Sequence, residues 1–166
     1  FFLVQVVSEI MALMAKIILF VSLFVAINCQ KEDVAAAKSS PSTKGFYHIP
    51  PFRANWFRAV NYCHSIHMKL VTIESKAKND DVANFLKTQR NLYNYWIGGY
   101  DLAKKFSFTW IEPGSPFEYT NWSANEPNNA NNNEDCVHIV HQPHLQQFFT
   151  WNDHRCAELF DFICEN

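Results

Sequence analysis

Two segments beyond residue 54 carry apolar residues at the period of an α-helix. Asn55 can cap a helix over residues 56–67, and Ser75 can cap a second helix whose pattern continues to Gln89. The apolar positions on the two stripes are Phe57, Val60, Cys63, Val82, Phe85 and Leu86. Because each stripe covers only one face, we expect both helices to pack against the rest of the domain.

The rest of the domain alternates between short β-type runs and polar loops. Residues 106–110 alternate strictly, which is typical of a half-buried strand. Gly98-Gly99 ends an apolar run where the backbone can turn or approach a neighbour closely. Residues 125–133 are rich in asparagine, which tolerates turns and left-handed conformations, so we expect no regular element there. The expected strands are residues 70–73, 96–99, 106–110, 136–140, 148–151 and 161–164. Helices followed by short strands and a long polar loop indicate an α+β domain.

The first 44 residues differ in composition from the rest. Residues 1–10 precede Met11, and we interpret them as an upstream fragment of the translation. A lysine followed by the apolar run of residues 17–26 is typical of a secretory signal peptide, and this run is too short for a membrane span. We therefore expect residues 1–29 to be removed, residues 30–44 to form a flexible segment, and residues 45–166 to form one secreted, extracellular domain.

The cysteine count supports removal of the signal peptide. Five cysteines are an odd number for a secreted protein, and Cys29 would leave with the signal. In an oxidising compartment the remaining four should pair, although the sequence does not choose among the three pairings. These cysteines are Cys63, Cys136, Cys156 and Cys164. The formal net charge is −2 and there is no basic block, which argues against a nucleic-acid partner.

Hard oxygen ligands are concentrated in residues 126–135 and 151–153. Calcium binds carboxylate and amide oxygens in such numbers, whereas zinc and redox metals favour other donors. Nothing nearby resembles a nucleophile and no Gly-x-Ser-x-Gly elbow is present, so we expect a binding site and not an enzyme. A plain solvent loop would explain the asparagines, but not the later Trp151-Asn152-Asp153. The candidate calcium ligands are Glu126, Asn128, Glu134, Asn152 and Asp153.

In their order along residues 46–165, these features resemble the C-type lectin-like domain family. The landmarks are Asn61-Tyr62-Cys63, Leu70-Val71-Thr72-Ile73, Trp96-Ile97-Gly98-Gly99, Phe108-Thr109-Trp110, Asn121-Trp122, Glu126-Pro127-Asn128, Glu134-Asp135-Cys136, Trp151-Asn152-Asp153, Cys156 and Phe162-Ile163-Cys164-Glu165. The resemblance implies the short form of the domain, with an α+β C-type lectin-like fold of two helices, short antiparallel sheets and a long calcium-binding loop. It also implies two disulfides, Cys63–Cys164 and Cys136–Cys156.

The resemblance further implies how the site would work. One principal calcium ion would lie on the five candidate ligands, with the Glu126–Pro127 bond cis, and would bind two neighbouring sugar hydroxyls. The expected sugar-contacting residues are Glu126, Asn128, Glu134, Asn152 and His154. In the family, Glu-Pro-Asn accompanies mannose, N-acetylglucosamine and fucose. We therefore expect a calcium-dependent lectin for glycans on cell surfaces or glycoproteins, active in pathogen or glycoprotein recognition.

Two alternatives to this specificity remain open. One is galactose-type recognition despite the motif, and the other is a lectin-like domain that binds a protein partner. A single sugar contact of this kind is weak, so useful affinity would come from several domains together, as in a homo-oligomer.

One departure from the family pattern concerns its auxiliary calcium ion. The matching positions are Asp101, Lys105, Asn129, Glu134 and Asp135, where Lys105 and Asn129 replace expected carboxylates. A lysine repels a cation, so we expect the auxiliary site to be weak or absent. Residues 125–133 should then be more mobile without calcium than in relatives that bind two ions.

The histidines can be explained by structural as well as functional roles. His64 and His67 lack a third zinc ligand at a sensible spacing, and we expect them on the helix surface. Most of His138, His141, His144 and His154 should be solvated, although His154 follows Asp153 and can touch sugar. As carboxylates and histidines gain protons, calcium affinity should fall between about pH 7 and 5.

Asn121-Trp122-Ser123 is an N-glycosylation sequon, which makes Asn121 a candidate modification site. Aromatic residues near it are better explained by the core than by sugar stacking. The tryptophans expected in the core are Trp96, Trp110, Trp122 and Trp151.

Overall fold

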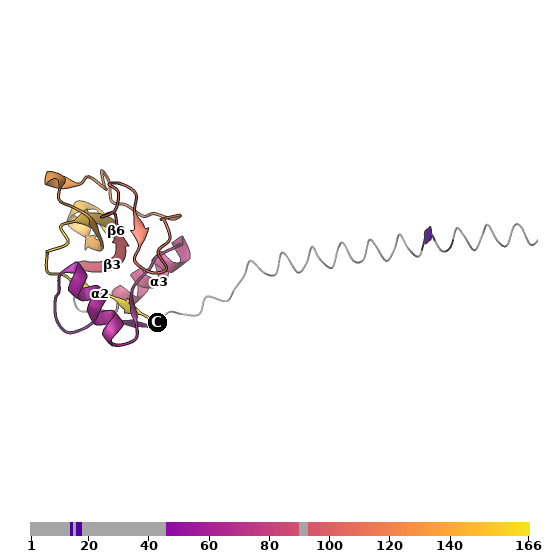
Figure 1. The fold of residues 1–166 in the computed structure, drawn as a ribbon, viewed down its shortest axis with the longest axis horizontal. Coiled ribbons are helices and arrows are strands. Elements are labelled where there is room, and N and C mark those ends of the chain that lie inside the picture. Colours follow the sequence, from indigo (N-terminus) through magenta and orange to yellow (C-terminus); the bar gives the residue numbers. More distant parts are fainter. Residues whose placement is uncertain (1–13, 15, 18–45, 90–92) are drawn as a thin grey trace, which may run out of the picture. The chain divides into compact units, whose positions relative to one another are not determined.

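The computed structural model describes Met14, Lys16 and Ile17, residues 46–89 and residues 93–166 (Figure 1). Internal contacts group Lys44–Asn166 into one compact unit. Apart from Met14, Lys16 and Ile17, the expected signal peptide and flexible segment lie outside the described residues.

Both expected helices are present, and each begins at the predicted cap. The helix α2 spans Trp56–Ser65, and the Asn55 side chain accepts a hydrogen bond from the backbone N–H of Arg58 at 2.9 Å. The helix α3 spans Lys76–Leu86, and the Ser75 hydroxyl accepts the N–H of Lys78 at 3.2 Å. A side-chain oxygen at this position satisfies one of the free donors of the first turn.

The first helix differs from its prediction at two points. It ends at Ser65 and not at residue 67, because His67 adopts a left-handed conformation (φ 58°) in the turn that follows. The buried stripe consists of Trp56, Ala59, Val60 and Cys63, and Phe57, which was expected on it, is 49% exposed. Trp56 takes the inward position one residue earlier.

Within the described residues, eight short strands form two sheets. They are β1 (Tyr47–His48), β2 (Lys69–Leu70), β3 (Asn94–Tyr100), β4 (Thr109–Trp110), β5 (Cys136–Gln142), β6 (Gln147–His154), β7 (Asp161–Phe162) and β8 (Cys164–Glu165). One sheet has the order β1-β8-β2 and the other the order β4-β3-β5-β6, with β7 parallel to β3. The turns η1 (Ala130–Asn132) and η2 (Pro143–Leu145) are 3-10 helical. The α+β class is confirmed.

Several predicted strands were too long. Residues 106–110 contribute only Thr109–Trp110, because Phe106 is left-handed (φ 61°) and its N–H donates to the Asp101 carboxylate at 2.7 Å in a turn. The run 161–164 divides at Ile163 into strands of different sheets, and only Leu70 of residues 70–73 pairs in a strand. The expectation of no regular element in residues 125–133 misses the short turn η1.

The glycine pair serves one of its two expected roles. It lies inside β3 and does not turn the chain. A Cβ on Gly99 would lie 2.5 Å from the Phe117 ring and 3.0 Å from Val137, so the close approach requires glycine.

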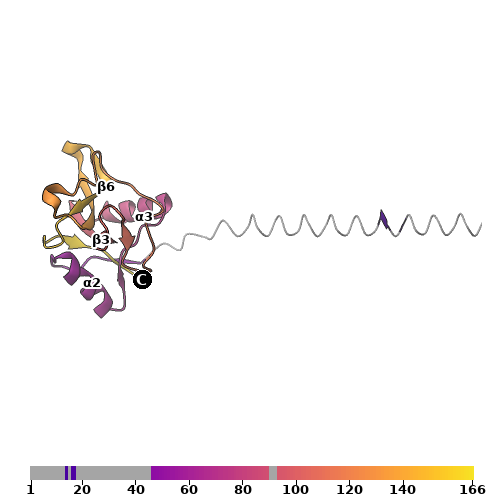
Figure 2. The ribbon, with the colours of Figure 1, turned by 45° about the horizontal axis from the view of Figure 1, so that its top comes forward.

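The strand β3 divides the interior into two cores, with α2 and α3 on opposite sides of it (Figures 1 and 2). Tyr95 and Ile97 pack with α3 and Trp151, whereas Trp96 packs with α2. Alternate side chains of a strand point to opposite faces, which explains this division. The predicted buried tryptophans Trp96, Trp110 and Trp151 are fully buried, and Trp122 is half-buried against the first core.

Both implied disulfides are present. Cys63–Cys164 closes 101 residues and joins α2 to β8, and Cys136–Cys156 closes 20 residues beside the start of β5. On the loop-entropy model they contribute about 4.7 and about 3 kcal/mol, respectively. The longer bridge holds the two ends of the domain together.

Candidate metal centre

The loop before β5 has an unusual backbone that depends on asparagine. The Glu126–Pro127 bond is cis, as the family resemblance implied. Four asparagines have positive φ, a region that asparagine enters more easily than most residues. They are Asn125, Asn129, Asn131 and Asn132. The sequence therefore permits a tightly folded loop in which polar side chains turn towards β6.

Asp153 fixes this loop to β6. Its carboxylate is completely buried and accepts the backbone N–H groups of Asn128 at 3.0 Å and Asn129 at 2.8 Å. Buried carboxylates are tolerated when such donors satisfy them. The residue immediately after Glu126-Pro127 is thereby held against the strand that carries Asn152.

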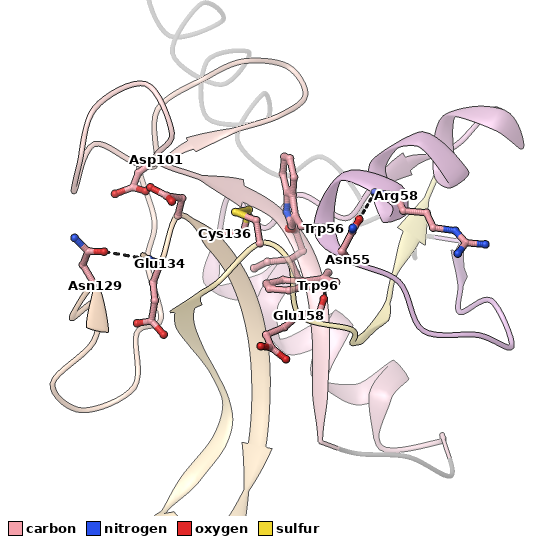
Figure 3. The surroundings of a disulfide bond; sticks show 12 residues. Asn55, Trp56, Arg58, Trp96, Asp101, Asn129, Glu134, Cys136 and Glu158 are labelled. Atoms are coloured by element: carbon pink, nitrogen blue, oxygen red, sulfur yellow. Dashed lines mark hydrogen bonds between the residues drawn. A yellow bond between two sulfur atoms is a disulfide. The ribbon is translucent and has the colours of Figure 1, made fainter. Parts of the chain in front are cut away.

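Glu134 closes the other half of the loop. Its side chain is 8% exposed, and one oxygen accepts the N–H of Ala130 at 2.8 Å. In return, the Asn129 side chain accepts the N–H of Glu134 at 3.1 Å (Figure 3). Figure 3 also shows Cys136, two residues further along the chain, and Asp101 above Glu134 in this view.

Two side-chain oxygens at this place are buried without a partner. Oε1 of Glu126 accepts from the Asn128 amide at 3.0 Å, but its Oε2 has no hydrogen-bond partner, and neither has Oδ1 of Asn152. Burial, the neighbouring Asp153 carboxylate and then Glu134 raise the pKa of Glu126 to about 7, although the Asn128 N–H acts against this. Unpaired buried acceptors beside like charge are unfavourable unless a cation or protons join them.

The donor chemistry fits a calcium ion. Among the described residues, no three His, Cys, Asp or Glu side chains are arranged to hold a metal by themselves. The carboxylates of Glu126, Glu134 and Asp153 therefore do not form such a group by themselves, and the amide oxygens of Asn128 and Asn152 would have to complete a calcium site. A mixed set of carboxylate and amide oxygens is typical of calcium.

The positions matched to an auxiliary ion contain an internal cation instead. The Lys105 ammonium contacts the Asp135 carboxylate, lies 3.4 Å from the buried Asp101 carboxylate, and donates to the Glu134 carbonyl at 3.0 Å. Burial opposes its charge, but the hydrogen bond to Asp135 and the charge of Asp101 raise the pKa of Lys105. The amine therefore offsets one of the two negative charges of Asp101 and Asp135.

The histidines are placed differently from one another. Most of the four histidines in this region were expected to be solvated, but His138 is only 3% exposed, and burial followed by the nearby His154 lowers its pKa to about 3. The strand alternation of β5 turns it inward towards Trp96 and Phe160. His154 is half-buried, with its ring 5.2 Å from that of Phe160. His64 is exposed and bonds to Glu112 in a shallow pocket with His67.

The sequon at Asn121 lies against β6. The Asn121 amide donates to the Phe149 carbonyl at 3.0 Å, and the Ser123 hydroxyl, which is buried, bonds to that of Thr150 at 2.7 Å.

One supporting residue escaped prediction. Asn79 on α3 is buried and accepts the indole N–H of Trp151 at 2.9 Å, which orients the residue before Asn152. The only indication of this role in the sequence is that Asn79 is a polar residue on an otherwise apolar stripe of the helix.

Comparison with known proteins assigns this architecture. The model of the lectin C-type domain matches residues 53–166. The chain is 34% identical over 123 residues to C-type lectin mosGCTL-7 of Aedes aegypti, which covers 72% of this chain and 81% of that protein. It is 31% identical to salivary C-type lectin 1 of Aedes albopictus, with coverage of 87% and 97%. A C-type lectin mannose-binding isoform of Oxyuranus scutellatus is 35% identical, with coverage of 67% and 70%.

Solved structures agree with this assignment. The mouse scavenger receptor C-type lectin carbohydrate-recognition domain superposes with a TM-score of 0.65 at 27% identity, and covers 76% of this chain and 93% of that one. The cow CD23 domain was solved in the presence of GlcNAc2Man3 oligosaccharide. It superposes with a TM-score of 0.63 at 28% identity, and covers 77% of this chain and 95% of that one. Within the described residues no helix is long and apolar enough to span a membrane. The family is non-enzymatic, and this chain belongs to it: it contains a C-type lectin domain.

Proposed function

We propose that the chain is a secreted lectin that binds sugars through one calcium ion. The observation that carries this proposal is the pair of buried oxygens without partners, Glu126 Oε2 and Asn152 Oδ1, beside the buried carboxylate of Asp153. Glu126, Asn128, Glu134, Asn152 and Asp153 would hold the ion. Their charges leave about one net negative charge with calcium bound, which suits a stable site.

The chain's own residues would orient the sugar. When bound, calcium supplies coordination positions for two vicinal hydroxyls, because its shell accepts up to about eight oxygens. Glu126 and Glu134 can only accept hydrogen bonds, whereas Asn128 and Asn152 can also donate through their amides. This placement of donors and acceptors selects the hydroxyl geometry. His154, which follows Asp153 on β6, would contact the sugar from the side.

We further propose mannose, N-acetylglucosamine or fucose as the sugar class. The Glu126-Pro127-Asn128 tripeptide supports this, and so do two relatives: the Oxyuranus protein is named a mannose-binding isoform, and the cow domain was solved with a GlcNAc2Man3 oligosaccharide. Galactose-type binding and a protein partner are the competing outcomes.

Lys105 supports a single-ion site. Its ammonium occupies the acidic group of Asp101 and Asp135, where a second cation would otherwise be needed. We therefore propose that the auxiliary calcium site is absent or weak.

Secretion and recognition of foreign or host glycoproteins complete the proposal. Relatives from Aedes albopictus are salivary proteins, and both disulfides suit an extracellular protein. Because one sugar contact is weak, avidity would come from a homo-oligomer that binds glycans on a cell surface.

A glycan array run with calcium and then with chelator tests the proposal. We expect binding to mannose-type glycans that chelator abolishes. Asp153→Asn should lose this binding, and Glu118→Gln, which changes an exposed carboxylate outside the centre, should keep it. Binding that survives chelator would favour a protein partner or another calcium-independent ligand. Calcium-dependent binding to galactose glycans would contradict the proposed mannose, N-acetylglucosamine or fucose class.

A further inference from the structure

A groove of about 450 Å³ lies between α3 and the first half of β6, and none of the five candidate calcium ligands lines it. One wall is a stripe of α3 and its C-cap, made of Lys76, Asp80, Ala83 and the cap residue Lys87. Their spacing of four, three and four residues puts them on one helix face over about 16 Å. The groove is therefore elongated along the helix.

The other wall owes its shape to a bulge in β6. The strand pairs shift between Val140–Thr150 and His141–Phe148, so that Phe149 is the extra residue, and its φ is 57°. This region is strained for a bulky side chain. Successive residues of a regular strand face opposite ways, but here both Phe148 and Phe149 line the groove.

The aromatic wall combines an exposed surface with a stacked floor. Phe148 is 57% exposed, whereas Phe149 is buried. The His141 ring stacks on Phe149 with 4.2 Å between centroids, and its Nδ1 is buried without a hydrogen-bond partner. The groove thus offers an apolar face and an unused polar atom side by side.

One cation in the groove has no acidic partner. Lys76 pairs with Asp80 at 2.7 Å, but among the described residues no carboxylate lies within ion-pair distance of Lys87. Its ammonium donates to the Asn84 amide at 3.1 Å and lies 5.7 Å from the Phe149 ring. Burial and the charge of Lys87 lower the pKa of His141, which favours the neutral imidazole. The groove therefore carries a local positive charge on a chain of formal net charge −2.

We propose that this groove binds an acidic sugar residue, with its carboxylate or sulfate at Lys87 and its apolar face on Phe148. Lysine binds both anions as a point charge, and the C–H face of a pyranose suits an exposed aromatic ring. His141 Nδ1 remains available to a sugar hydroxyl.

The choice of a sugar over an acidic peptide rests on the proposed function and on the edge of β6. Phe148 and Asn152 are four residues apart on one strand, about 13 Å, so a short oligosaccharide at the metal centre could extend into the groove. A peptide would need free backbone groups along β6. The segment 121–123 already uses them, because Asn121 bonds to Phe149 and Trp151, and Ser123 bonds to Trp151.

Backbone amide NMR with chelator present tests the groove separately from the metal centre. The probe is a hyaluronan tetrasaccharide, which carries glucuronate, and chitotetraose is the neutral control of equal length. The protein carries an unmodified Asn121, verified by mass. We expect hyaluronan alone to shift the amides of Lys87, His141 and Phe148. Lys87→Gln should weaken this binding about fivefold, as expected for one exposed charge, and Phe148→Ala should also weaken it.

Lys104→Gln is the matched control, because Lys104 is exposed but lies outside the groove, and it should bind as the unmodified chain does. Equal binding of chitotetraose, or an unchanged affinity of Lys87→Gln, would overturn the proposal. So would the same shifts produced at lower concentration by a hexaglutamate peptide. If hyaluronan shifts the groove amides but the protein shows no calcium-dependent mannose binding, the proposed function is refuted and the groove proposal stands.

Discussion

Asp153 and Asn128 are joined by a hydrogen bond of 3.0 Å from the backbone N–H of Asn128 to the buried carboxylate. The same carboxylate also accepts the N–H of Asn129. One side chain of β6 therefore fixes the loop and, in the proposed site, would also coordinate the ion. Loop conformation and calcium affinity should depend on it together.

Asp153→Ala tests this double role. The substitution leaves two backbone donors without a partner, so we expect a loss of about 1–3 kcal/mol in the free energy of unfolding in chelator. Calcium affinity should fall by at least about a hundredfold, because a charged ligand is gone as well. Hydrogen exchange should accelerate at Asn128 and Asn129. Normal protection at these amides would show that the loop does not depend on Asp153.

Glu126 should make calcium binding depend on pH. Its pKa of about 7 without metal means that calcium must displace a proton as pH falls through this value, so affinity should decrease towards pH 5. Calorimetry in two buffers of different ionisation enthalpy would detect the released proton at pH 6.5. The variant Glu126→Gln should release none, and the same proton count in this variant would contradict the assignment.

The stability of the metal-free protein should respond to Glu126 in the opposite direction. A carboxyl group whose pKa is higher in the folded than in the unfolded state destabilises the fold when ionised. Its contribution to stability therefore increases as pH falls from about 7 towards its ordinary pKa of about 4.5. Thermal unfolding of Glu126→Gln in chelator should lack this component. Calcium-loaded protein should instead lose stability over the same range.

His138 should oppose this trend. Its pKa is lowered to about 3, so the unfolded chain takes up a proton below about pH 6.5 that the folded chain does not. Stability is lost as pH falls from about 6.5 to 3. Neither ring nitrogen has a partner, and His138→Phe should stabilise the protein by about 1–3 kcal/mol and reduce its acid sensitivity. His144→Gln, at an exposed position, is the control. An unchanged acid midpoint in His138→Phe would exclude this role.

Lys105 should behave as an internal substitute for an ion. Lys105→Met leaves the buried Asp101 carboxylate without its cation, and we expect a loss of about 2 kcal/mol or more in the free energy of unfolding. Lys104→Met, at the exposed neighbouring position, should change little. Calcium titration of the unmodified chain should give one ion per molecule. A stoichiometry of two tight ions would refute the single-site proposal.

Local signals in the sequence predicted much of the fold. Asn55 and Ser75 cap the helices because a side-chain oxygen next to an apolar stripe is a local property. The two disulfides came from the ordered landmarks of the family, not from spacing. Strand ends were less predictable: Phe106 alternates correctly in sequence, but its N–H donates to the Asp101 carboxylate five residues earlier, and this local bond places it in a turn.

Features of the site that depend on tertiary contacts were out of reach. The burial of His138 follows from sheet register, and the strain at Phe149 follows from a register shift in the β5–β6 pair that the alternation of residues along β6 does not reveal. Asn79 looked like a polar interruption of a helix, and only the contact with Trp151 gives it a role.

Crystallisation in calcium and oligomannose tests the central claim most directly. The account predicts one ion at about 2.3–2.6 Å from side-chain oxygens of Glu126, Asn128, Glu134, Asn152 and Asp153, with two adjacent mannose hydroxyls completing its shell. An ion bound elsewhere, or mannose seated away from this ion, would contradict it.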